Sequence, residues 1–191
     1  LEFFERREVR HVISYLRLIA NPADDGACER IVNVPTRGIG AKSLDLVKAF
    51  ARTHKLSMLD ALARAGEIDR LGPGAAESIA AFAALIREFA AFAKSLGPAT
   101  LLKTLLDRTQ YVQQFTKSDD DKNRILNVGE MVNAAAEYES KHRETGSLQG
   151  FIDEITLSSD QDDLDDDSPT VSLMTLHAAK GLEFPAVFRS E

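Results

Sequence analysis

Apolar residues recur every three or four positions through most of this chain. The first such pattern predicts an amphipathic helix whose buried face holds Val9, Val12, Ile13, Leu16 and Ile19. Asn21-Pro22 should end that helix, because a residue before proline resists the α conformation. Shorter patterns predict helices around residues 44–50 and 59–62, and Ser57 is placed to cap the second of these.

The strongest apolar stripe follows the helix-breaking run Gly72-Pro73-Gly74 and ends at Gly97-Pro98. It consists of Ile79, Phe82, Leu85, Ile86, Phe89, Phe92 and Leu96. A spacing near 3.5 residues also suits a coiled-coil seam, but too few heptads are sustained for one. We therefore predict a central core helix within a bundle.

The second half of the chain predicts more helices, joined by polar segments. One helix should start at Leu101 and run as far as Phe115, and Ser118–Asp121 is interpreted as an acidic turn. Another should start near Ile125 and end before Gly146, followed by a short helix over residues 148–155. Residues 158–169 are rich in Ser and Asp, which is typical of a solvated linker.

The character of the chain changes after this linker. Residues 171–175 form a short apolar run with β-forming residues, and residues 184–188 form a second one after a polar turn. Such a tail does not suit a helical bundle. The predicted fold is therefore mainly α, with a short strand-containing remnant of an α/β domain at the end.

Charge is distributed unevenly along the 191 residues. The net charge is −7, but six aspartates lie between residues 160 and 167, whereas residues 1–58 carry a net charge of +3. Binding responds to local charge, so the overall acidity leaves room for a DNA-facing surface. No apolar run is long enough for a membrane span. Cys28 is the only cysteine, which excludes a disulfide framework within the chain and fits a reducing, cytoplasmic setting.

The run Pro35-Thr36-Arg37-Gly38-Ile39-Gly40 carries the first candidate chemistry. Two glycines allow the backbone to approach a phosphate closely, and a predicted helix starts just after them. Arg37 would add a charge-assisted contact, with Thr36 and Lys42 as secondary candidates. The alternative is a helix connector that only needs its glycines, with Arg37 in solvent.

The run Thr175-Leu176-His177-Ala178-Ala179-Lys180-Gly181-Leu182-Glu183 is the second candidate. A strand would deliver a hydroxyl and an imidazole to a turn that also holds a lysine, a glycine and a carboxylate. This set suits a nucleotide or polynucleotide at the end of a strand.

Three ordered segments resemble the superfamily 1 DNA helicases of the UvrD/PcrA/Rep group. Residues 175–185 resemble helicase motif V. Residues 3–9, continuing to Pro22, resemble the region after motif IV, and residues 33–40 resemble the segment with the Gly-Ile-Gly duplex-binding turn. In that family two RecA-like motor domains, 1A and 2A, sandwich ATP, and a mostly helical 2B domain is inserted into 2A.

The resemblance implies a division of this chain. Residues 1–20 would be the outgoing 2A helix, residues 21–168 the 2B domain with the acidic linker at its end, and residues 169–191 the returning 2A segment with motif V. The chain has no Gly-x-x-x-x-Gly-Lys-[Ser/Thr] phosphate loop and no arginine-rich motif VI. The resemblance implies ATP and Mg²⁺ for the parent enzyme, whereas the chain alone, which lacks these motifs, should be inactive as an ATPase.

The resemblance also implies roles for individual residues. DNA would be contacted by Thr36, Arg37, Gly38, Ile39, Gly40 and Lys42 on the duplex, and by Thr175 and His177 on the single strand. Gly181 and Glu183 would lie near the ATP ribose. No metal ligands and no catalytic residues are expected within this chain.

The function implied is that of a duplex-binding, regulatory 2B fragment of an ATP-dependent 3′–5′ DNA helicase of repair or replication. Its partners would be duplex and single-stranded DNA, the remaining helicase domains (1A and the rest of 2A) and repair proteins, at the nucleoid of the bacterial cytoplasm. Two alternatives remain: a piece of a recombination helicase–nuclease subunit, and a non-enzymatic helical interaction module.

Overall fold

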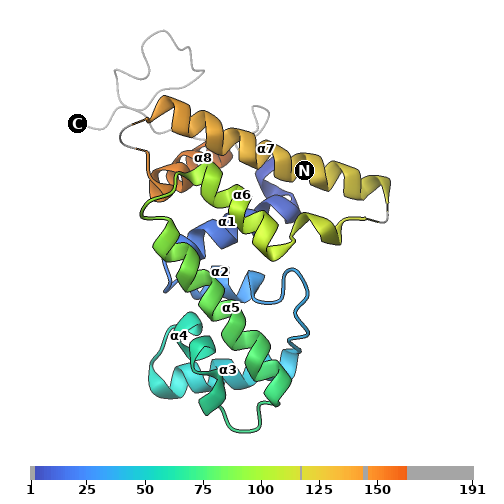
Figure 1. The fold of residues 1–191 in the computed structure, drawn as a ribbon, viewed down its shortest axis with the longest axis vertical. Helices are drawn as coiled ribbons and strands as arrows, with labels where there is room; N and C mark the ends of the chain where they lie inside the picture. Colours follow the sequence, from blue (N-terminus) through green and yellow to red (C-terminus); the bar gives the residue numbers. More distant parts are fainter. Residues whose placement is uncertain (1–2, 117, 144–145, 163–191) are drawn as a thin grey trace, which may run out of the picture.

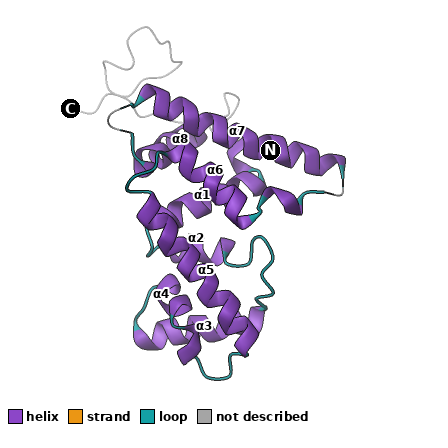
Figure 2. Cartoon of the chain, in the orientation of Figure 1, coloured by secondary structure: helices purple, strands orange, loops and turns teal. Residues whose placement is uncertain are grey.

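The computed structural model describes residues 3–116, 118–143 and 146–162, and every regular element in these ranges is a helix (Figure 2). The prediction of a mainly α fold is therefore confirmed. The strand-like tail at residues 171–188 lies outside the described residues. The elements in chain order are η1 (Phe3–Glu5), α1 (Arg7–Ala20), α2 (Asp25–Ile31), α3 (Ala41–His54), α4 (Met58–Ala63), η2 (Ala65–Glu67), α5 (Pro73–Phe92), α6 (Pro98–Thr109), η3 (Val112–Gln114), α7 (Asp119–Lys141) and α8 (Leu148–Asp162).

Two groups of helices are joined by α1 and α5. Figure 1 shows α6, α7 and α8 gathered with α1 at one end and α3 and α4 at the other, with α5 running between them. Helix α1 contacts α2, α5, α7 and α8, and helix α5 contacts α4, α1 and α6. One continuous apolar core results.

Helix α5 is the central core helix that the sequence predicts. Ile79, Phe82, Ile86 and Phe89 are each at most 1% exposed. Burying an aromatic or aliphatic side chain of this size contributes about 1.5–3 kcal/mol. The helix ends at Phe92, one turn earlier than the apolar stripe, and the chain then turns toward Gly97.

Two predicted helix ends are confirmed. Helix α1 ends at Ala20, and the Asn21 N–H makes its last hydrogen bond to the Arg17 carbonyl at 2.8 Å. The Ser57 hydroxyl caps α4 by accepting a hydrogen bond from the Asp60 N–H at 3.1 Å.

The prediction that the helix after Leu101 runs to Phe115 is wrong. Helix α6 ends at Thr109, because Gln110 adopts a left-handed conformation with φ of 53° and the Tyr111 N–H turns back to the Leu106 carbonyl. Tyr111 is 1% exposed and donates a hydrogen bond from its hydroxyl to the Glu8 carbonyl. Burying this tyrosine against α1 turns the chain out of the helix.

The interpretation of Ser118–Asp121 as a turn is also wrong, because α7 begins there. The Ser118 hydroxyl accepts from the Asp121 N–H, and the Asp121 carboxylate accepts from the Ser118 N–H, which completes a capping box. Aspartates in a first helical turn are favoured by the helix dipole. Helix α8 likewise extends to Asp162, so it includes the first residues of the predicted linker at 158–169.

None of the helices described in these ranges combines the length and the apolar character that crossing a bilayer requires.

Candidate nucleic-acid interface

The turn between α2 and α3 holds the duplex-binding candidates that the sequence predicts. Val32 is the C-cap of α2, Gly40 is the N-cap of α3, and Figure 1 shows the connecting segment as a loop at the edge of the molecule. This arrangement brings Thr36, Arg37, Gly38 and Lys42 together within one short stretch. The segment that resembles motif V, with Thr175, His177, Gly181 and Glu183, lies outside the described residues.

The side chain of Asn33 closes the turn. Its Oδ1 accepts hydrogen bonds from the N–H groups of Arg37 at 2.7 Å and Ile39 at 3.3 Å, and its Nδ2 donates to the Ile39 carbonyl at 3.0 Å. Asn33 is a functional residue of the turn that was not among the residues predicted from the sequence. The signal was present, because asparagine before a proline- and glycine-containing segment commonly bonds to backbone groups of the turn.

The guanidinium of Arg37 points into the protein. Its Nη1 donates to the carbonyls of Ile31, Val32 and Pro35 at 3.1–3.2 Å. Its Nη2 donates to the Tyr15 hydroxyl at 2.6 Å. These hydrogen bonds occupy the guanidinium group, which the sequence predicted would contact a phosphate.

Two other helices take part in holding Arg37. The guanidinium carbon lies 4.9 Å from the centre of the Phe82 ring on α5, a cation–π distance. The Tyr15 hydroxyl on α1 also donates to the Val34 carbonyl. Burial raises the pKa of Tyr15, and the Arg37 charge opposes that rise. Arg37 therefore links the turn to two helices, which favours a role in shaping the turn.

The two glycines of the turn differ in the reason for their presence. Gly38 has φ of 71°, a left-handed conformation in which a side chain is strained. Gly40 has φ of −79° and ψ of 160°, which any residue adopts, and a Cβ there would meet no atom within 4 Å. The fold of the described residues thus requires Gly38 but not Gly40. Open space at Gly40 suits close approach of an external group.

Ile39 lies between the two glycines and is only 3% exposed. Its side chain joins the core, and both of its backbone polar groups bond to Asn33. The glycines on either side are exposed, as are Thr36 and Lys42. Ile39 thus anchors the turn, and its neighbours form the surface.

The start of α3 presents unsatisfied backbone donors at this surface. Among the described residues, no acceptor is found for the N–H groups of Gly40, Ala41 and Lys42, and all three residues are exposed. Helix α3 has 14 residues and no acidic residue in its first turn. Free N–H groups and the positive end of the helix dipole attract an anion such as a phosphate. Contacts of this kind hold DNA without reading its sequence.

The described residues offer no metal site. Within residues 3–116, 118–143 and 146–162, no cluster of three His, Cys, Asp or Glu side chains could hold an ion. The two residues that the resemblance assigns to ATP, Gly181 and Glu183, lie beyond these ranges.

Comparison with known proteins identifies one matching family and several similar proteins that are DNA helicases. Residues 1–190 match the family described as the UvrD-like helicase C-terminal domain. Over 98% of this chain, DNA helicase II of Escherichia coli is 38% identical, and the ATP-dependent DNA helicase PcrA of Bacillus subtilis is 35% identical. The ATP-dependent DNA helicase UvrD1 of Mycobacterium leprae is 36% identical over 97% of the chain. The chain spans only 26–27% of the length of these relatives.

Proposed function

Because the chain belongs to the UvrD-like helicase C-terminal domain family, we propose that it is the duplex-binding 2B part of an ATP-dependent 3′–5′ DNA helicase. In this proposal residues 1–20 and 169–191 belong to the 2A motor domain, and residues 21–168 form 2B. The 2B domain grips duplex ahead of the motor and regulates unwinding by swivelling. The names of the three relatives, all DNA helicases, support a helicase as the parent protein, and a role in repair or replication in the bacterial cytoplasm is part of the proposal.

The observation that carries the proposal is the set of exposed N–H groups of Gly40, Ala41 and Lys42 at the start of α3. Asn33 and Arg37 fix the turn that precedes them, so these donors are already oriented before DNA arrives. Gly38, Gly40, Lys42 and Thr36 would meet phosphates. With so few contacts, duplex affinity should lie in the nonspecific range, with Kd of about 10⁻⁴–10⁻⁶ M.

Two residues of the turn have a different role in this proposal. Arg37 and Ile39 shape the turn from inside, and the guanidinium of Arg37 acts on DNA affinity only through that shape. In the intact enzyme, Thr175 and His177 would lie near single-stranded DNA, and Gly181 and Glu183 near the ATP ribose, as the resemblance implies.

The sharpest test is the substitution Gly40→Val. The backbone at Gly40 accepts a β-branched residue without strain, and the new side chain would find open space in the free protein. We expect unchanged stability but duplex affinity lowered about threefold to tenfold, because the side chain separates the N–H groups from the phosphate. Gly66→Val is the matched control, because Gly66 is also exposed and also has open space around its Cβ position.

The measurement is a salt titration of binding to a mixed-sequence DNA duplex. Affinity should fall as salt rises, and Gly40→Val should bind more weakly than wild type at each salt concentration. Equal affinities and equal salt slopes for wild type, Gly40→Val and Gly66→Val would show that the turn is only a helix connector.

The chain alone should hydrolyse no ATP, with or without single-stranded DNA. Its sequence lacks the phosphate loop and the arginine-rich motif that hold ATP and Mg²⁺ in such enzymes. A phosphate-release assay checks this, and DNA-stimulated turnover by a helicase-free preparation would overturn the assignment as a 2B fragment.

A further inference from the structure

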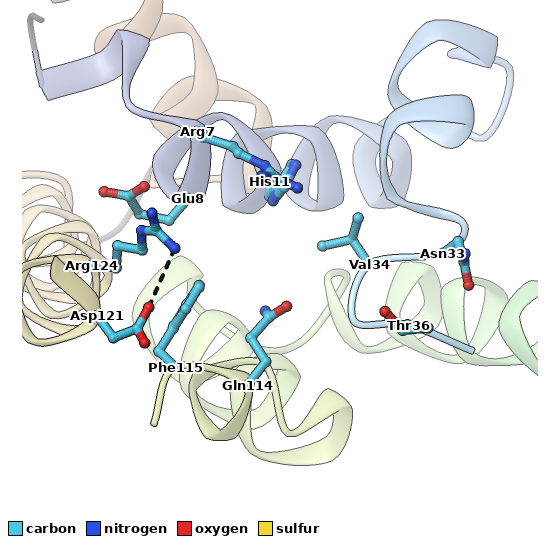
Figure 3. A pocket seen from close by; sticks show the side chains of 10 residues that line it. All are labelled: Arg7, Glu8, His11, Asn33, Val34, Thr36, Gln114, Phe115, Asp121 and Arg124. Carbon is cyan, nitrogen blue, oxygen red and sulfur yellow. Dashed lines mark hydrogen bonds and ion pairs between the residues drawn. The ribbon is translucent and has the colours of Figure 1, made fainter. Parts of the chain in front are cut away.

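A polar groove runs beside the turn, between it and the segment that links α6 to α7. Two adjoining cavities, of about 220 and 410 Å³, share Thr36 and Gln114 in their walls. In the smaller one, His11, Phe115, Gln114 and Val34 lie around a common space, with Arg124 at one side (Figure 3). The larger one continues past Pro35 toward Gln110 and Gln113. Because Thr36 and Gln114 line both, the two cavities adjoin, and together they are called the groove.

The outer part of this groove offers neutral hydrogen-bonding groups. Thr109, Gln110, Gln113 and Gln114 line it together with Arg37, and no carboxylate is among its lining residues. The Thr109 hydroxyl donates to the Leu105 carbonyl and Gln114 Nε2 donates to the Tyr111 carbonyl, so the amides of Gln110 and Gln113 are the groups best placed to meet a ligand. Amide and hydroxyl groups such as these are common partners of the sugar–phosphate backbone.

The inner part of the groove contains two acids, but both are engaged within the protein. Glu8 is 7% exposed and accepts a hydrogen bond from Asn127 Nδ2 at 2.6 Å. Asp121 accepts from the Ser118 N–H and pairs with Arg124 at 3.3 Å. These carboxylates are held by donors of their own, which reduces their repulsion of an incoming phosphate.

Arg7 provides an available positive charge at this end. It is exposed, and no residue in the described part of the chain accepts a hydrogen bond from it or forms an ion pair with it. Its neighbour His11 is bonded through Nδ1 to the Tyr111 hydroxyl at 3.1 Å. The same hydroxyl reaches the Glu8 carbonyl at 3.1 Å, so it links the His11 ring to the backbone of α1.

His11 is affected first by burial and then by nearby charges. Burial, together with the charges of Arg7, Arg30 and Arg10, lowers the pKa of His11 to about 4, while Glu8 opposes the shift. The charged residues that line this end are two arginines, Arg7 and Arg124, and two carboxylates, Glu8 and Asp121. Arg124 is paired with Asp121, so Arg7 is the arginine in this lining that has no ion-pair partner among the described residues.

We propose that this groove is a second DNA contact, which takes the phosphate backbone of the same duplex that the turn holds. This inference rests on the proposed function of the turn. Thr36 in the groove wall and Gly40 in the turn are four residues apart, so at most about 14 Å separate them. That distance corresponds to about four base pairs of DNA at 3.4 Å each, so one duplex can reach both. Arg7 meets a phosphate, and the glutamine amides bond along the strand.

The first experiment compares Arg7→Gln with Arg143→Gln in the complete 191-residue chain. Arg143 is an exposed arginine that follows the far end of α7, so its loss changes the net charge equally without touching the groove. We expect Arg7→Gln to lower duplex affinity about threefold to tenfold and to reduce the salt slope by about 0.9, the value for one phosphate contact. Arg143→Gln should leave both nearly unchanged.

The second experiment locates DNA directly. Cys28 is fully buried, so a cysteine introduced by Gln113→Cys can carry a photo-crosslinker selectively. Irradiation should join duplex DNA to this position, whereas the control Ser140→Cys, on the exposed far end of α7, should give little product.

The outcomes separate the two proposals. If Gly40→Val weakens binding while Arg7→Gln matches Arg143→Gln and Gln113→Cys does not crosslink, the groove inference is wrong and the turn remains a DNA contact. If Gly40→Val has no effect but the groove variants do, the groove binds DNA and the proposed role of the turn is wrong. If none of the variants differs from its control, both proposals are wrong.

Discussion

Arg37 holds its turn from the inside, so its removal should act mainly on stability. Arg37→Ala deletes hydrogen bonds to three carbonyls and to the Tyr15 hydroxyl, as well as the contact with the Phe82 ring. We expect the free energy of unfolding to fall by about 2–4 kcal/mol, since buried acceptors lose a charged donor. Arg37→Lys should restore little, because an ammonium cannot reproduce the planar fork.

Urea unfolding followed by circular dichroism measures this effect. Arg52→Ala, an exposed arginine on α3, is the control and should change stability by no more than about 0.5 kcal/mol. Normal stability of Arg37→Ala combined with weakened duplex binding would instead support the direct phosphate contact predicted from the sequence.

His11 should make stability depend on pH. Its pKa is lowered from 6.5 to about 4 in the folded protein by burial and by Arg7, Arg30 and Arg10, against the opposing charge of Glu8. The unfolded chain therefore binds the proton more readily between these values, and stability falls as pH drops from about 6.5 through about 4. The loss should be roughly 1–2 kcal/mol, below the ~3.4 kcal/mol of the full shift, because the ring is partly exposed.

Other groups titrate in the same pH range, so the test compares the pH dependence of stability in wild type with that in a variant without His11. The unfolding free energy of wild type and His11→Gln should be compared at pH 7 and pH 4.5. Glutamine keeps a donor for the Tyr111 hydroxyl but cannot gain a proton, so His11→Gln should lose less stability on acidification. Parallel pH profiles of the two proteins would show that His11 is not buried as described.

At the scale of the element, the start of α7 depends on one serine. Ser118→Ala removes the hydroxyl that accepts the Asp121 N–H and breaks the capping box. We expect a loss of about 1 kcal/mol in unfolding free energy, the usual effect of losing an N-cap. Ser140→Ala, at an exposed position within α7, should be neutral or slightly stabilising. Thermal melts of both variants provide the comparison, and equal melting temperatures would argue against the cap.

Helices with a strong apolar period could be predicted from the sequence. The residues at which helices begin and end could be predicted in some cases only. The apolar spacing at residues 9–19 and 79–89 was sufficient to predict two helices, because burial of the apolar side chains determines which face of each helix points to the core. The end of α6 depends on the Tyr111 hydroxyl reaching the Glu8 carbonyl, 103 residues away in sequence. The start of α7 could not be predicted, because a run of aspartates after a serine is equally typical of a polar turn.

In the candidate site, too, features made by neighbouring residues could be predicted, whereas features made by residues distant in the sequence could not. The Gly-Ile-Gly turn and the helix after it follow from neighbouring residues, and the sequence predicted both. The inward direction of Arg37 depends on Tyr15 from α1 and Phe82 from α5, which no local pattern brings together. The groove beside the turn arises only when residues near 7, 36 and 114 meet, so it could not be predicted from the sequence.

At the scale of the whole molecule, the described helices share one core, and α1 and α5 connect its two ends. This arrangement predicts that α2 cannot open while the rest stays folded. Cys28 on α2 is a natural reporter, since it is fully buried. Burial, assisted by Asp25, Asp24 and Glu29, raises the pKa of its thiol to about 12.

A thiol reagent should therefore modify Cys28 only through global unfolding. The free energy obtained from its labelling rate should equal that from urea unfolding followed by circular dichroism, which reports helices at both ends of the molecule. The variant that combines Cys28→Ala with Ser140→Cys supplies the rate for an exposed thiol. If Cys28 reacted with a clearly smaller free energy than global unfolding, α2 and the turn that follows it would open as a separate unit. The donors at the start of α3 would then not be fixed before DNA binds.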